Sequence, residues 1–154
     1  MNPNHKTINN QEGATAVEFA IVLSVLLLFI FGIIEFSLAL FNQQVITNAA
    51  REGARRGVIM RAPTRIVDDE NAEIKARVME FAESYLVTFG DDILTIDDVK
   101  INFDDDIDAD DPVRGLSPGN DLIVQVTYEY QFLFLSTIGI GPIDLTSTAT
   151  MKME

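Results

Sequence analysis

Hydrophobic and polar residues divide the beginning of the chain sharply in two. Residues 1–13 are polar, whereas residues 14–41 are almost continuously apolar and carry charges only at Glu18 and Glu35. A helix over this run would be ~42 Å long at ~1.5 Å per residue, against a hydrocarbon core of ~30 Å. The pattern therefore predicts a membrane-spanning helix.

This helix is expected to stay on the mature protein. A secretory signal would end in a small-residue cleavage site, but the residues after Phe41 read NQQVITNAAREGARRG. No proline interrupts the helical pattern before Pro63, so one helix is expected over residues 14–61, running from the membrane into the next compartment. The one attractive small-residue junction, at Gly13, precedes the apolar run and makes residues 1–13 a candidate leader.

Residues 62–154 have the pattern of a small α+β domain. Between Asp69 and Phe89, ahead of Gly90, apolar residues recur three or four apart, which predicts a second, amphipathic helix. The residues of this face are Ile74, Val78, Phe81, Tyr85 and Phe89. Alternating apolar positions predict about three strands, and the Pro118-Gly119 and Gly141-Pro142 pairs fit turns of an antiparallel sheet. The alternating residues are Val99, Ile101 and Phe103, then Leu122, Val124, Val126, Tyr128, Tyr130, Phe132 and Phe134, and last Leu145, Ser147, Ala149, Met151 and Met153.

Charge argues against a nucleic-acid partner. The formal net charge is -13, and from Asp68 onward the chain has 20 acidic residues but only 5 basic ones. Such a surface repels phosphate backbones. The chain contains no cysteine, which excludes disulfides and thiolate metal sites.

An aspartate-rich stretch is the one candidate metal site in the sequence. Its alternating carboxylates resemble the start of a calcium loop, but a standard EF-hand would require glycine at Ala109 and glutamate at Gly115. Either a weak, irregular calcium site or a solvated acidic turn fits, and no other cofactor is expected. The candidate ligands are Asp104, Asp106, Asp108 and Asp110.

Catalysis has no support in the sequence. The only histidine is His5, in the leader, and no serine lies in a recognisable nucleophile motif. We therefore expect a protein that is not an enzyme.

The junction at the start of the apolar run raises the question of how Glu18 is compensated. A carboxylate five residues into an apolar helix is costly. Cleavage after Gly13 would create a cationic α-amine on Ala14, which could meet Glu18 of a neighbouring subunit and fix the register of an assembly. Alternatively, Glu18 lies at the headgroup boundary and extends toward water.

Two further features of the long helix each allow two interpretations. Glu35 lies ~25 Å beyond Glu18, where it is either an interfacial residue or a contact for an arginine or lysine on another protein of an assembly. Ala49, Gly53 and Gly57 form a ridge of small residues four apart, which either admits close packing of another helix or of the chain's own sheet, or marks a hinge.

Four segments together resemble the TadE-like minor pseudopilins of bacterial tight adherence (Flp pilus) systems. They are Gly13 with Glu18-Phe19, the stretch GIIEF at residues 32–36, the stretch NAAREGAR at residues 48–55, and the ending Ala149-Thr150-Met151. The resemblance implies a pilin-like fold, cleavage after Gly13 by a prepilin peptidase, and a role in pilus assembly or initiation.

The same resemblance implies a single-pass protein of the bacterial inner membrane, with its distal domain outside the cytoplasm or incorporated into the pilus. Its partners would be other pilins or pseudopilins, the prepilin peptidase and the inner-membrane assembly platform. Charge bias alone predicts the opposite topology, because Arg51, Arg55 and Arg56 flank the far side of the span. The rival hypothesis from the residues is a signal-anchored, calcium-binding envelope adhesin or sensor.

Overall fold

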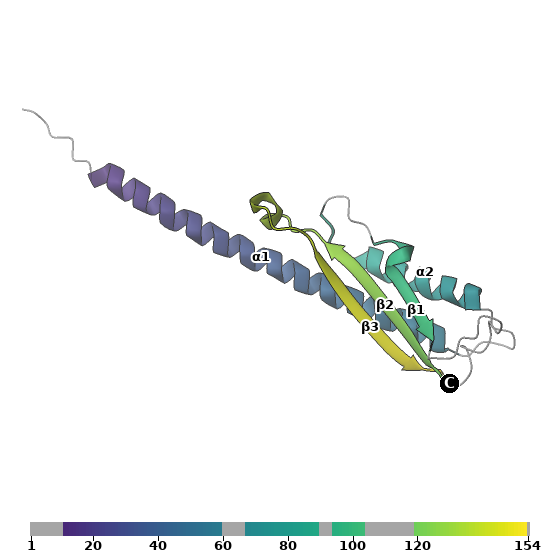
Figure 1. The fold of residues 1–154 in the computed structure, drawn as a ribbon. Coiled ribbons are helices and arrows are strands. Elements are labelled where there is room, and N and C mark those ends of the chain that lie inside the picture. Colours follow the sequence, from purple (N-terminus) through teal and green to yellow (C-terminus); the bar gives the residue numbers. More distant parts are fainter. Residues whose placement is uncertain (1–10, 60–66, 90–93, 104–118, 154) are drawn as a thin grey trace, which may run out of the picture.

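The computed structural model of the chain describes residues 11–59, 67–89, 94–103 and 119–153. It confirms the α+β architecture: a long N-terminal helix, a second helix and a three-stranded antiparallel sheet (Figure 1). Helix α1 (Gln11–Val58) is 48 residues long, ~72 Å at the usual rise per residue. Its C-terminal half packs against the rest of the domain, while most of its N-terminal half projects beyond the domain (Figure 1).

The buried residues of α1 explain how one helix serves two environments. From Glu35 to Gly57 a stripe of side chains at helical spacing is buried, whereas residues 13–31 are exposed throughout. A stripe of this kind is the face that a helix packs against a core. It consists of Glu35, Ala39, Asn42, Val45, Ile46, Ala49, Ala50, Gly53, Ala54 and Gly57.

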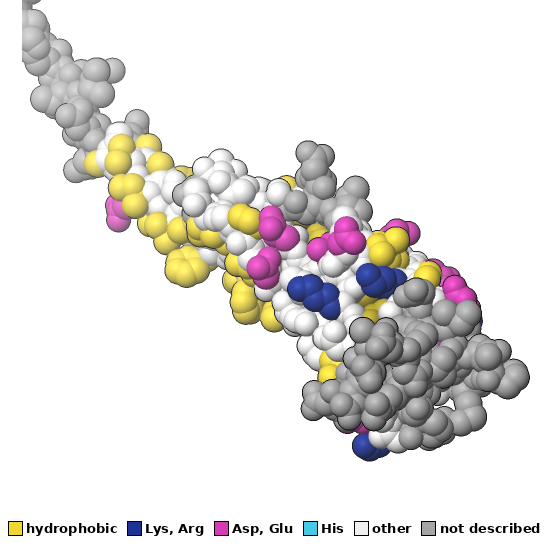
Figure 2. All heavy atoms as spheres, turned by 45° about the vertical axis from the view of Figure 1, so that its right-hand side comes forward, with side chains coloured by type: hydrophobic (Ala, Val, Ile, Leu, Met, Phe, Trp, Pro, Cys, Tyr) yellow, Lys and Arg dark blue, Asp and Glu magenta, His cyan; other side chains and the backbone are white. Residues whose placement is uncertain are grey.

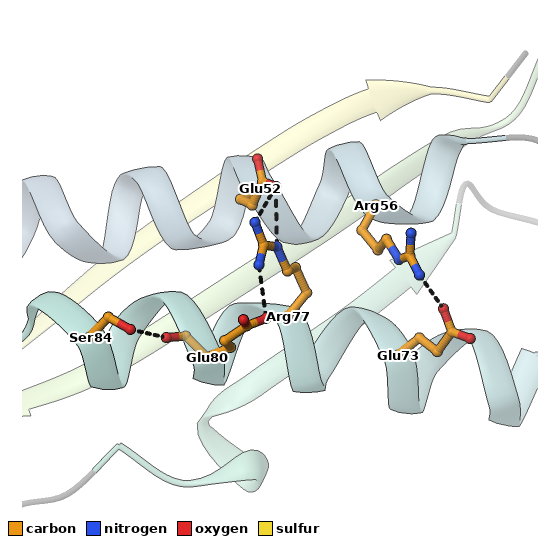
Figure 3. A network of polar contacts seen from close by, with 6 residues as sticks. All are labelled: Glu52, Arg56, Glu73, Arg77, Glu80 and Ser84. Atoms are coloured by element: carbon orange, nitrogen blue, oxygen red, sulfur yellow. Dashed lines mark hydrogen bonds and ion pairs between the residues drawn. The ribbon is translucent and has the colours of Figure 1, made fainter.

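Helix α2 (Val67–Tyr85) lies beside the C-terminal half of α1 (Figures 1 and 3). It packs through Ile74, Val78 and Ala82, which recur every four residues and are buried. The expected helical face included Tyr85, which is instead 56% exposed, and the helix ends before Phe89. The predicted end was too late because the backbone of Val87 is bonded to a side chain of α1 and leaves the helical path.

The sheet has the strand order β1-β2-β3, with β1 (Val99–Phe103) and β3 (Ile143–Lys152) on either side of β2 (Asp121–Tyr130). Both pairs are antiparallel, with Ile101 opposite Val124 and Val124 opposite Ala149. Alternate residues of β2 are buried toward the helices, as the sequence pattern predicts. The sheet and α2 both pack against α1, and α2 reaches the sheet chiefly at β1.

A short helix, η3 (Leu135–Ile138), lies in the connector between β2 and β3, which we define as residues 131–142. Strand β2 ends at Tyr130, so Phe132 and Phe134 continue the alternating pattern only in sequence and belong to this connector. Gly139 ends η3 with φ of 89°, a left-handed conformation that glycine adopts without a steric penalty. The connector therefore turns back toward the middle of α1 (Figure 1).

Candidate functional site

The predicted processing and assembly residues lie on the exposed N-terminal part of α1. Ala14, Glu18 and Phe19 are all exposed, and the helix runs through Gly13 to begin at Gln11. Among the described residues, none forms a hydrogen bond or ion pair with the Glu18 carboxylate. Figure 2 shows hydrophobic side chains gathered along this part of the molecule, with acidic and basic side chains concentrated over the domain. Both interpretations of Glu18 are compatible with this exposed position.

Within the described ranges, α1 is the one helix that is long and apolar enough to cross a membrane. No residue of its apolar window is buried within the described chain. A buried core helix would be apolar for packing reasons, but this one presents its apolar side chains outward. The helix therefore fits a membrane anchor.

Glu35 has partners inside its own chain that the sequence pattern did not indicate. Its side chain is fully buried, and its carboxylate accepts hydrogen bonds from the backbone N–H groups of Leu133 and Phe134, the latter at 2.8 Å. The hydroxyl of Tyr130 donates a longer bond of 3.4 Å. A buried carboxylate is tolerated when its oxygens are hydrogen-bonded in this way. Glu35 thus fastens the β2–β3 connector to α1.

Tyr130 acts as a hydrogen-bond donor in this cluster. Burial, together with the adjacent Glu35 carboxylate, raises the pKa of Tyr130 to about 12. The hydroxyl therefore keeps its proton to a higher pH than an ordinary tyrosine does, and remains a hydrogen-bond donor. Both interpretations of Glu35, an interfacial residue and a contact with another subunit, stay predictions.

Asn42 is a second buried polar residue on the same stripe. Its side-chain amide donates to the carbonyl of Val87 at 2.7 Å, and its side-chain oxygen accepts from the Val87 N–H at 3.0 Å. These two bonds satisfy both the backbone N–H and the backbone carbonyl of Val87. The sequence signal for both residues was their spacing: Glu35, Ala39, Asn42 and Ile46 follow one helical face.

The ridge of small residues packs within this chain. Ala49, Gly53 and Gly57 are all buried. A Cβ atom added to Gly53 would overlap a methyl group of Val78 on α2, and one added to Gly57 would meet side chains from both α2 and β2. The missing side chains therefore allow α2 and the sheet to approach the backbone of α1 closely.

Ion pairs join the exposed sides of the two helices (Figure 3). Arg77 of α2 donates to Glu52 of α1 at 2.9 Å and to Glu80 at 2.8 Å, while Arg56 lies 3.3 Å from Glu73. The bonds to Glu80 and Glu52 raise the pKa of Arg77 above its ordinary value. These pairs border an open groove of about 480 Å³. Because they are exposed to solvent, they contribute little to the stability of the domain.

The predicted calcium ligands, Asp104, Asp106, Asp108 and Asp110, lie outside the described residues. Within the described part of the chain, no group of three or more histidine, aspartate or glutamate side chains is placed to hold a metal ion. The calcium hypothesis stays a prediction.

Comparison with known proteins supports the resemblance found in the sequence. Residues 13–55 match the family model described as TadE-like protein. The match covers α1 almost to its end, including Glu18, Glu35 and Asn42, and it stops before α2 and the sheet. No curated protein and no solved structure matches the chain.

Proposed function

We propose, from the TadE-like match of its first helix, that this chain is a membrane-anchored minor pseudopilin that takes part in assembly or initiation of a Flp-type adhesive pilus. One observation carries the proposal: the family match falls on α1, whose apolar N-terminal half is exposed along residues 13–31. Such a surface is available first to lipid and then to the helices of other pilins. The domain on α1 would serve as a structural module, not as an enzyme.

The proposed maturation step is cleavage after Gly13 by a prepilin peptidase. The α-amine released on Ala14 would then pair with the Glu18 carboxylate of a neighbouring subunit, which no described residue of the same chain neutralises. Pairing of a buried carboxylate offsets its desolvation and fixes helix register. Before assembly, the chain would reside in the bacterial inner membrane with its domain outside the cytoplasm, in contact with the assembly platform.

Mass spectrometry of the native protein tests the processing step. We expect the mature N-terminus at Ala14, because the Gly13-Ala14 bond is the small-residue junction before the apolar run. Deletion of the prepilin peptidase should leave the unprocessed chain in the membrane. A native N-terminus at Met1, or one beyond Phe41, would contradict the proposal.

Replacing Glu18 with glutamine tests the pairing step. The variant should insert into the membrane normally but yield about tenfold fewer pili, the factor that corresponds to ~1.4 kcal/mol of lost pairing per subunit. Pilus yield is measured by shearing and immunoblotting. Glu12→Gln is the matched control, because residue 12 would be removed with the leader. Equal pilus yield from Glu18→Gln and wild type would favour the headgroup interpretation.

A further inference from the structure

The β2–β3 connector is apolar in a domain that is otherwise strongly acidic. From Tyr130 to Ile143 there is no charged residue, although the chain as a whole carries -13. Several of its large side chains face outward: Leu133 is 43% exposed, Phe134 37% and Ile140 44%. Contiguous exposed apolar side chains of this size mark a contact with a membrane or another protein.

The connector contacts α1 within the predicted membrane span. The ring of Phe134 stacks on that of Phe31 at 4.3 Å between centroids, and Glu35 holds the adjacent backbone. Phe31 lies ~26 Å along the helix from Ala14, and ~20 Å from Glu18. Whether the hydrocarbon begins at Ala14 or at Glu18, this stack lies within its ~30 Å thickness, toward the far boundary.

Several backbone N–H groups of the connector are hydrogen-bonded within the protein. The N–H groups of Leu133 and Phe134 are bonded to Glu35. Those of Thr137, Gly139 and Ile140 are bonded to carbonyls of the connector itself, each at 3.1 Å. Non-helical backbone is tolerated at membrane depth when its polar groups are satisfied by protein.

From these three observations we infer that residues 131–142 insert into the outer leaflet of the bilayer alongside α1. The occupant of this surface is lipid, because the exposed side chains of the connector continue the apolar surface of α1, which is itself exposed over residues 13–31. Glu35 then lies between the helix and the connector, shielded from hydrocarbon by both. The inference rests on the proposed membrane anchoring of α1.

The insertion also restricts how the domain sits on the membrane. A single spanning helix lets a domain rotate and tilt, whereas a second insertion beside it defines which face of the domain points toward lipid. The sheet would therefore be held against the membrane at its β2–β3 end, with the opposite end pointing away.

Site-directed spin labelling tests the insertion, and the absence of native cysteine makes single-cysteine variants straightforward. The full chain is reconstituted in vesicles of phosphatidylethanolamine and phosphatidylglycerol with a nitroxide at Leu133→Cys or Ile140→Cys. Thr148→Cys, on the exposed face of β3, is the aqueous control, and Leu27→Cys, in α1, is the lipid reference. Circular dichroism verifies that each variant folds.

For each label we measure the ratio of its collision rate with oxygen, which dissolves in lipid, to its collision rate with a neutral nickel chelate, which stays in water. We expect the ratio at positions 133 and 140 to be close to that at position 27 and several-fold above that at position 148. If they resemble the label at 148 while 27 reports lipid, the insertion is wrong and the anchoring stands. If 27 itself reports water, the proposed anchor fails instead. Protection from both reagents, rising with the protein-to-lipid ratio, would assign the surface to a second copy of the chain and overturn the inference.

Discussion

Replacing Gly53 with leucine should lower the stability of the domain by about 3 kcal/mol, the upper part of the usual range for overpacking a core. A Cβ atom at this position already overlaps Val78 Cγ2, and Val78 is fully buried. The Val78 side chain cannot avoid this overlap by changing rotamer, since its branched Cβ allows few rotamers. Helix α1 must therefore move away from α2, and the packing between the two helices is lost.

Thermal unfolding of the full chain in detergent, followed by circular dichroism, measures this effect. A loss of about 3 kcal/mol corresponds to a fall in Tm of about 6 to 12 °C for a chain of this size. Gly32→Leu makes the same change on the same helix where nothing lies within 4 Å of the added Cβ, so it should not lower Tm. Equal Tm values for the two variants would mean that α2 does not pack on the ridge as closely as described.

Replacing Glu35 with leucine should cost a similar amount for a different reason. The leucine side chain fills much of the volume but leaves the N–H groups of Leu133 and Phe134 without an acceptor. Each unsatisfied buried donor costs about 1–3 kcal/mol, and relief of the buried charge offsets part of the sum. We expect a net loss of about 3 kcal/mol. Glu35→Gln keeps one acceptor oxygen and should lose less.

Amide hydrogen exchange separates this effect from a general loss of stability. In Glu35→Leu the amides of residues 133 and 134 should exchange faster even under conditions where the rest of the domain stays protected. Glu83→Leu, the same substitution at an exposed site on α2, serves as the control and should leave exchange at these amides unchanged. Unaltered exchange in Glu35→Leu would show that the carboxylate does not hold the connector.

Local patterns in the sequence predict the elements of this fold well. The apolar run, the alternation in β2 and the spacing of Ile74 and Val78 each reflect a face that has to be buried in lipid or in the core. The errors arise at element ends. Helix α2 stops at Tyr85 because Asn42, which is distant in sequence, binds the backbone of Val87. No pattern within residues 69–89 contains that information.

For the candidate site too, the sequence identifies the residues but not their partners. Glu35 could be recognised from sequence as an acid at the end of an apolar segment, but its partners lie 95 to 99 positions later in the chain. The ridge could be recognised as small, whereas what fills the space beside Gly53 and Gly57 depends on how α2 and β2 cross α1. Residue type indicates that a contact is needed, and only the tertiary fold supplies the partner.

The distribution of contacts along α1 has a mechanical consequence. Glu35, Asn42, Gly53 and Gly57 hold the connector, the end of α2 and the sheet along ~33 Å of one rigid helix. A pull on the N-terminal half of α1, parallel to its axis, loads these attachments together in shear instead of opening them one after another. We therefore expect the domain to resist a force parallel to α1 far better than a force that peels it sideways from the helix.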